Sequence, residues 1–146
     1  MGKQQGLLRP EELRRITSEK DMEEAKKAMA LREKAQDQAK QLYKAFMEEE
    51  LDPDVAQARV SAAVRGAAEK GKSEVLMLEI DSEWCTDRGR AINNTEPDWP
   101  QTLTGFAKRA FDYFETALRP LGYRLRAEVL DFPGGMPGKI GLYLAW

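Results

Sequence analysis

The sequence predicts an α+β fold in which an N-terminal long helical hairpin precedes a small sheet packed by one amphipathic helix, in the order α-α-β-α-β-β. Three observations lead to this prediction. Residues 19–50 contain neither Gly nor Pro and are rich in strong helix formers. A second amphipathic helical pattern begins near residue 100. Residues 123–146 alternate between apolar and polar side chains on both sides of a Gly-rich turn, which is typical of an antiparallel hairpin.

The first helix of the hairpin is unusually long. We expect a flexible lead over residues 1–17, and Ser18 resembles an N-cap, so the helical hairpin is predicted over residues 18–70. About 32 helical residues span ~48 Å, whereas a folded unit of ~75 residues is only ~30 Å across. The apolar side chains of this helix recur at spacings of three and four and form one stripe. The members of this stripe are Ala28, Leu31, Ala35, Ala39, Leu42 and Phe46.

The second helix of the hairpin has clear start and stop signals. Asp52 is a good N-cap, Pro53 suits the first helical position, and Gly71 suits a left-handed C-terminal residue. Alanine is frequent in both helices, and its small side chain buries little apolar area. We therefore expect a thin hairpin that gains stability when a partner covers it.

Residues 71–146 are predicted to form a compact α+β domain with about three strands. The apolar run after Ser73 indicates a buried strand, and the Asp-, Asn- and Pro-rich segment after it indicates a long loop. Pro120 and Gly122 are typical of a helix end. The predicted elements are a strand over 75–80, a loop over 81–100, a helix over 99–119, and strands over 123–132 and 140–146.

Charge and cysteine content narrow the classes of function. The chain has 23 basic and 25 acidic residues, a net charge of −2, so a general phosphate-binding surface is disfavoured. The single cysteine excludes an intrachain disulfide and fits a reducing compartment. No run of apolar residues is long enough to cross a bilayer. We therefore expect a cytoplasmic protein without membrane contact.

Residues with catalytic chemistry are few. The chain contains no histidine, so Cys85 has no histidine to activate it, and the common histidine-containing zinc sites are excluded. The segment 134–139, GGMPGK, is one residue too short for a phosphate-binding loop, and a strand rather than a helix is predicted after it. We interpret this segment as a hairpin turn. No cofactor is expected, and the absence of catalytic residues favours a protein that is not an enzyme.

Acidic side chains at the end of the predicted strand over 75–80 raise one enzymatic alternative. Asp81, Glu83 and Asp87 follow this strand closely, and carboxylates in this arrangement bind Mg²⁺ in metal-dependent hydrolases. The Glu-x-Lys motif of such nucleases is missing from the neighbouring strand, which reads Glu128-Val129-Leu130. Solvated loop charges are therefore the preferred interpretation, with a metal site as the alternative.

Arg and Tyr side chains on the last two strands raise a second alternative. Tyr123, Arg124, Arg126 and Tyr143 combine positive charge with stacking surfaces, as in modules that bind single-stranded nucleic acid. Alternating arginines on an exposed strand face are also a common feature of soluble proteins, and the RNA-recognition consensus is absent. A nucleic-acid-binding module is therefore an alternative to the leading hypothesis.

The C-terminal layout resembles that of small phage-encoded proteins of unassigned role. In these proteins an Ala-rich helix ends at Gly before an apolar strand, a Gly-Tyr opens a later strand, and the chain closes with Trp. The matching segments here are AAEKGKSEVLMLEI (67–80), LGYRLRAEVL (121–130) and IGLYLAW (140–146). The resemblance implies a phage or prophage origin and identifies no active-site residue.

The leading hypothesis is a non-enzymatic structural or accessory protein that acts through self-association or protein binding. The stripe from Ala28 to Phe46 is either intramolecular core or a surface for association, and the sequence leaves both interpretations open. The length of the predicted helix favours a homo-oligomer, because one short neighbouring helix is not long enough to cover the stripe.

Overall fold

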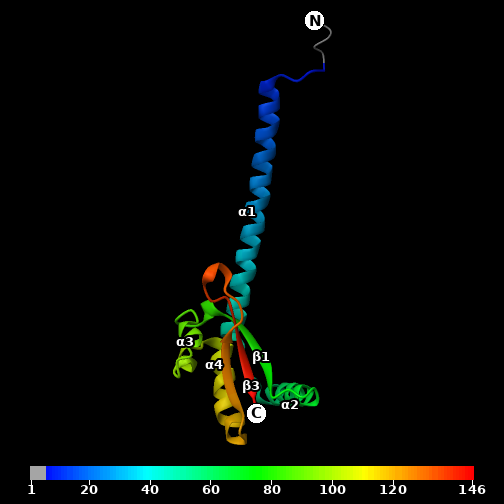
Figure 1. Cartoon of the computed structure of the whole chain (residues 1–146). Coiled ribbons are helices and arrows are strands. Elements are labelled where there is room, and N and C mark those ends of the chain that lie inside the picture. The colour runs from blue at the N-terminus through cyan, green and yellow to red at the C-terminus, as the bar shows by residue number, and fades with distance from the viewer. Residues whose placement is uncertain (1–5) are drawn as a thin grey trace. The chain divides into compact units, whose positions relative to one another are not determined.

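The computed structural model describes residues 6–146, so the first five residues of the predicted lead lie outside the described residues. The chain divides into two units, Met1–Leu42 and Tyr43–Trp146. The fold is α+β, with the predicted order of helices and strands (Figure 1). The labelled elements are α1 (Pro10–Glu48), α2 (Pro53–Glu69), β1 (Glu74–Asp81), α3 (Arg90–Asn93), α4 (Gly105–Tyr113), β2 (Arg124–Val129) and β3 (Lys139–Ala145).

Helix α1 begins at Pro10, eight residues before the predicted cap at Ser18. Proline suits the first helical position, and Glu11 and Glu12 favour the positive end of the helix dipole. The polar residues near Ser18 do not stop the helix, and the Thr17 hydroxyl donates to the carbonyl of Leu13 within it. The prediction of a flexible lead is therefore wrong for residues 10–17.

Helix α2 has the predicted caps at both ends. The Asp52 carboxylate accepts a hydrogen bond from the backbone N–H of Asp54 at 2.9 Å, and Pro53 opens the helix. At the other end the N–H of Lys72 donates to the carbonyl of Ala67. This pattern is a Schellman motif, and it requires the positive φ of +77° that Gly71 adopts.

Helix α2 belongs to the second unit. Its Val60 and Val64 pack against a buried cluster of Phe114, Leu118 and Leu144, and the helix contacts β1. The boundary between the two units therefore lies after Leu42, inside α1, and not at residue 70 as predicted. The reason is that α2 has apolar side chains on its sheet-facing side and covers part of the sheet with them.

The sheet is antiparallel with the strand order β1-β3-β2, and β2 and β3 form the predicted hairpin. Along β2 the burial alternates from residue to residue, as the sequence pattern predicts. On the central strand, Ile140, Leu142 and Leu144 are buried and face the core. The register between β1 and β3 shifts between Leu76 and Leu78, which marks a β-bulge.

The single helix predicted over 99–119 is divided into shorter pieces. A 3₁₀ turn ends at Thr102, Leu103 is extended and buried, and α4 begins at Gly105. Gly105 has φ +53°, a left-handed conformation that is unfavourable for residues other than glycine. The helix then continues as a π-helical turn over Phe114–Leu118 and ends at a left-handed Gly122. Helix α4 lies along one face of the sheet (Figure 1).

The segment 81–100, predicted as a loop, contains short helices. A 3₁₀ turn covers Ser82–Trp84, and α3 follows at Arg90–Asn93. The carboxylate of Asp87 accepts hydrogen bonds from the backbone N–H groups of Gly89 and Ala91. Local side-chain bonding therefore gives this polar segment a defined structure.

Candidate functional site

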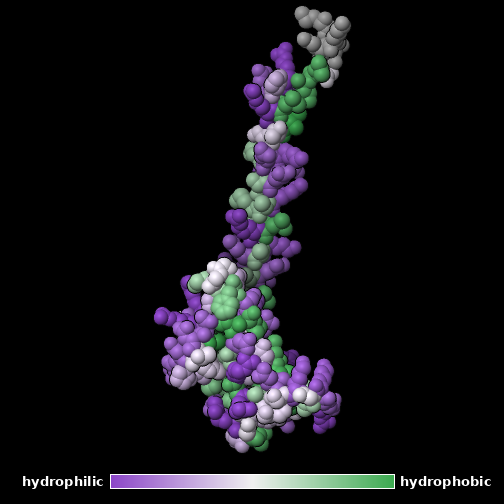
Figure 2. Space-filling model, viewed as in Figure 1, coloured by the Kyte–Doolittle hydropathy of each residue, from purple (hydrophilic) through white to green (hydrophobic). Residues whose placement is uncertain are grey.

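In the first unit the apolar side chains of α1 are exposed. Among the described residues of this unit only Glu12 is partly buried, and every other residue is exposed. Leu31 and Leu42 of the predicted stripe are 69% and 64% exposed. Hydrophobic patches recur between hydrophilic ones along α1 (Figure 2). The other large apolar side chains that are exposed in α1 of this unit are Leu13, Ile16, Met22 and Met29.

Phe46, the last member of the predicted stripe, belongs to the core of the second unit. It is 7% exposed, and its ring stacks on Trp84 with the ring centroids 4.5 Å apart. The backbone of Gly105 lies against the same phenylalanine. The five stripe residues from Ala28 to Leu42 therefore stay exposed, whereas Phe46 is not available to a partner.

The end of α1 is held by an arginine that the sequence interpretation did not single out. Arg109 of α4 donates through Nη1 to the backbone carbonyls of Met47 and Glu49, each at 3.0 Å. These carbonyls are at the C-terminal end of the helix, where carbonyl groups lack partners within the helix. The positive charge also favours the negative end of the helix dipole. Residues 43–49 are thus tightly integrated in the second unit.

The acidic residues considered for a metal site do not come together. Asp81 forms an ion pair with Lys139 at 3.3 Å, Asp87 caps α3, and Glu83 is exposed. Across residues 6–146, no three acidic, cysteine or histidine side chains are grouped so that they could hold a metal ion. Asp81 and Asp87 therefore have structural roles. The arrangement gives no support to a metal-dependent hydrolase.

Cys85 is buried behind the 3₁₀ turn of residues 82–84. Burial raises the pKa of its thiol to about 11, and the negative charge of Asp87 acts in the same direction. A hydrogen bond with the Thr102 side chain lowers the pKa, but by less. The thiol is therefore protonated at neutral pH and is not activated as a nucleophile.

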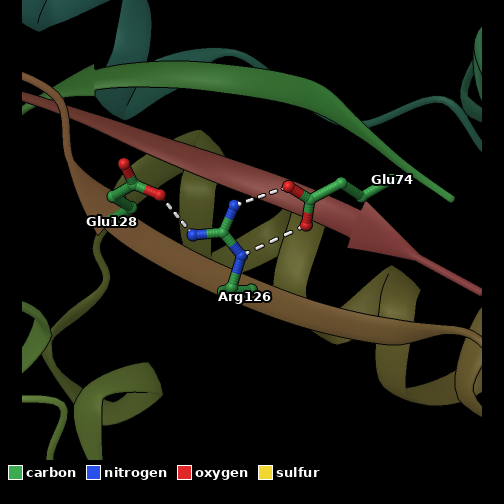
Figure 3. A network of polar contacts seen from close by, with 3 residues as sticks. All are labelled: Glu74, Arg126 and Glu128. Carbon is green, nitrogen blue, oxygen red and sulfur yellow. Dashed lines mark hydrogen bonds and ion pairs between the residues drawn. The ribbon is translucent and has the colours of Figure 1, made fainter. Parts of the chain in front are cut away.

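Arg126 lies at the centre of a polar network on the solvent-facing side of the sheet (Figure 3). Its Nη2 is 2.9 Å from a carboxylate oxygen of Glu74, and Nη1 is paired with Glu128. The hydrogen bonds that Arg126 donates, most strongly the one to Glu128 and then those to Glu74, raise the pKa of the guanidinium above its ordinary value. The guanidinium also lies over the Tyr143 ring, 4.3 Å from the centroid.

The four residues considered for nucleic-acid binding do not form one open basic surface. Arg126 covers the Tyr143 ring, and two carboxylates neutralise its charge. Tyr123 packs against the Phe114 cluster on the core side of the sheet, whereas Arg124 is exposed on the other side. A base that stacks on the Tyr143 face under Arg126 therefore has to displace this arginine.

The GGMPGK segment forms the connection between β2 and β3, as predicted. Pro133–Gly135 make a single 3₁₀ turn, and the backbone N–H of Gly138 donates to the carbonyl of Asp131. The carboxylate of Asp131 accepts from the N–H of Lys139 at 2.5 Å. Strand β3 follows directly, so no helix N-terminus is present to bind a phosphate group.

An apolar cavity lies in the second unit between α2, α4 and the core face of the sheet. It has a volume of about 140 Å³. Phe106, Phe111 and Phe114 are among its lining residues, and Arg59 and Tyr113 are the only ones with polar side chains. The hydrophobic pattern of the sequence indicates that these residues face the core, but it carries no signal that they leave a space.

The comparisons with known proteins identify no relative. No family model, no curated protein and no solved structure matches this chain. The resemblance to phage-encoded proteins therefore stays a prediction. Among the helices of residues 6–146, none combines the length and the apolar character that crossing a membrane requires.

Proposed function

We propose that this protein is a structural or accessory protein that acts through self-association, in which two copies pair through α1. The exposure of the apolar stripe carries the proposal. Leu31 and Leu42 are more than half exposed, and Ala28, Ala35 and Ala39 between and beside them are exposed too. Burial of one leucine side chain is worth ~1.5–3 kcal/mol, so a second helix on this stripe gains substantial apolar burial.

A long helix also needs such a partner for its own stability. Most helical stability in proteins comes from packing of an apolar face rather than from helix propensity. Within the first unit, α1 has the ion pair between Lys27 and Glu23 at 3.6 Å, an exposed i,i+4 pair worth only ~0.3–0.5 kcal/mol. Pairing of two copies would bury Leu31 and Leu42 and so supply the missing stabilisation.

The spacing of the stripe suits a helical partner. Ala28 and Leu31 recur 11 residues later as Ala39 and Leu42. A period of 11 residues corresponds to about 3.67 residues per turn, which keeps the stripe nearly parallel to the axis of a straight helix. The alanines of the stripe allow the backbone of a partner helix to approach closely, so that Leu31 and Leu42 are buried against it.

The charges of α1 favour an antiparallel pair. Residues 10–24 have six acidic and three basic side chains, a net charge of −3, whereas residues 25–48 have three acidic and six basic, a net charge of +3. An antiparallel arrangement places the acidic half of each copy beside the basic half of the other, so the stripe of each copy packs on the N-terminal half of the partner helix, where Leu13 and Ile16 are exposed. A parallel arrangement places like charges together, which is unfavourable.

The proposal is tested by sedimentation equilibrium of a matched pair of variants. Leu31→Asp places a charge in the stripe and should dissociate the pair to monomers of 16.6 kDa. Ala30→Asp places the same charge one residue away, outside the stripe, and should leave the pair intact. Equal masses for the two variants would show that the stripe is not the surface of association.

The orientation is tested separately by pulsed EPR with a spin label on Gln41→Cys, a position outside the stripe. In an antiparallel pair centred between residues 24 and 25, the two labels lie ~50 Å apart along the helix axis. In a parallel pair they lie within ~20 Å of each other. The buried native thiol of Cys85 is protected from the labelling reagent.

The structure supports the two alternative functions less well than it supports self-association. The nucleic-acid alternative requires Arg126 to leave Glu74 and Glu128, and the metal-dependent hydrolase requires side chains that lie apart. A phage or prophage origin stays a prediction from the resemblance alone.

A further inference from the structure

We propose that the second unit binds a small apolar molecule, about the size of a single aromatic ring, in the cavity between α2, α4 and the sheet. The cavity has a volume of about 140 Å³. An engineered cavity of ~150 Å³ lined by similar side chains is known to stay dry and to bind benzene. The size of the cavity therefore fits a single aromatic ring.

The lining specifies the chemistry of the ligand. Three phenylalanines contribute aromatic surface, and Leu142 and Leu144 of β3 form the floor on the core side of the sheet. Across residues 6–146, no buried side-chain nitrogen or oxygen lacks a hydrogen-bond partner, and the two polar side chains of the lining are not buried: Arg59 is exposed and Tyr113 is partly exposed. A water molecule needs two to four polar partners and is poorly accommodated, whereas an apolar ring needs none.

The local backbone gives a second reason to regard this cavity as a site. The residues that begin and end the π-helical turn, Phe114 and Leu118, are both buried and both line the cavity. A π-helical turn is rare, and turns of this kind inside α-helices are found frequently at functional sites. Here the turn supplies two of the side chains that surround the space.

Small side chains on the two facing helices keep the space open. Ala56 of α2 and Ala110 of α4 both line the cavity. Protein interiors are normally packed without voids of this size, and a larger side chain at either position would fill the space. The combination of alanines on both helices with three aromatic rings leaves room for a ligand ring, which would contact the phenylalanines.

Benzene binding to the full chain, measured by thermal unfolding and by NMR titration, tests the proposal. At a benzene concentration ten times the Kd, the melting temperature should rise by ~5 °C, and signals of the lining methyl groups should shift. A cooperatively folded protein that shows neither change over the accessible benzene concentrations would overturn the proposal.

Variants locate the binding. Ala110→Leu adds three carbon atoms inside the cavity and should abolish both responses, and Ala56→Leu does the same from α2 if the first variant fails to fold. Ala58→Leu makes the same change at an exposed position of α2 outside the cavity and should keep both responses. Benzene binding that persists unchanged in a folded, filled variant would place the ligand elsewhere and refute the assignment.

Discussion

Replacement of Gly105 by alanine tests how the last turn of α1 is fixed in the second unit. A Cβ atom at this position would lie 2.8 Å from the carbonyl oxygen of Phe46 and 2.9 Å from a ring carbon of the same residue. The Phe46 ring has little freedom to move, because it stacks on Trp84. The Met47 sulfur would also lie only 3.0 Å away. The new methyl group therefore has no space without a shift of backbone.

Two costs contribute to the expected loss of stability. Gly105 has φ +53°, and a left-handed conformation costs an alanine ~1–2 kcal/mol. Overpacking of a filled site typically costs a further ~1–3 kcal/mol. We therefore expect Gly105→Ala to lower the free energy of unfolding by ~2–5 kcal/mol.

Urea unfolding monitored by circular dichroism measures this change, with Gly66→Ala as the matched control. Gly66 lies within α2, and a Cβ there meets no atom within 4 Å. Since alanine is the better helix former, the control should raise the free energy of unfolding by ~0.5–1 kcal/mol. A Gly105→Ala protein as stable as the wild type would refute the close packing of Phe46 on Gly105.

Further predictions concern polar and titratable groups of the second unit. The free energy of unfolding should fall as the pH rises from about 9 to about 11. In this range the Cys85 thiol, with a usual pKa of about 9, loses its proton in the unfolded state but keeps it in the folded state. Cys85→Ala should flatten this decline. Arg126→Ala should cost less than ~1 kcal/mol in urea unfolding, since its ion pairs are largely exposed. Asp87→Ala should cost ~1–2 kcal/mol, because the backbone N–H groups of Gly89 and Ala91 lose their acceptor; an unchanged midpoint would show that α3 does not need this cap.

Most elements of the fold could be predicted from the sequence because their signals are local. The cap at Asp52, the left-handed Gly71 and the alternation along β2 each depend on a few neighbouring residues. Signals of this kind also misled where two of them competed. The cap pattern at Ser18 does not begin a helix, since the residues on both sides of it are helical. The hydroxyl of the neighbouring Thr17 donates to a backbone carbonyl within α1.

The features that could not be predicted depend on contacts between distant residues. Glycine is needed at position 105 because the Phe46 ring and carbonyl, 59 positions earlier, occupy the space of a side chain. The role of Arg109 likewise depends on the carbonyls of Met47 and Glu49. The cavity depends on the distances between α2, α4 and the sheet, which hydrophobic periodicity does not encode.

The mass of the intact protein in solution tests the proposed pairing of α1 most directly. Sedimentation equilibrium over a range of protein concentrations should give a species of twice 16.6 kDa, with the monomer appearing on dilution. A mass of 16.6 kDa at every concentration would contradict the proposal, because the exposed leucines of α1 would then stay in water.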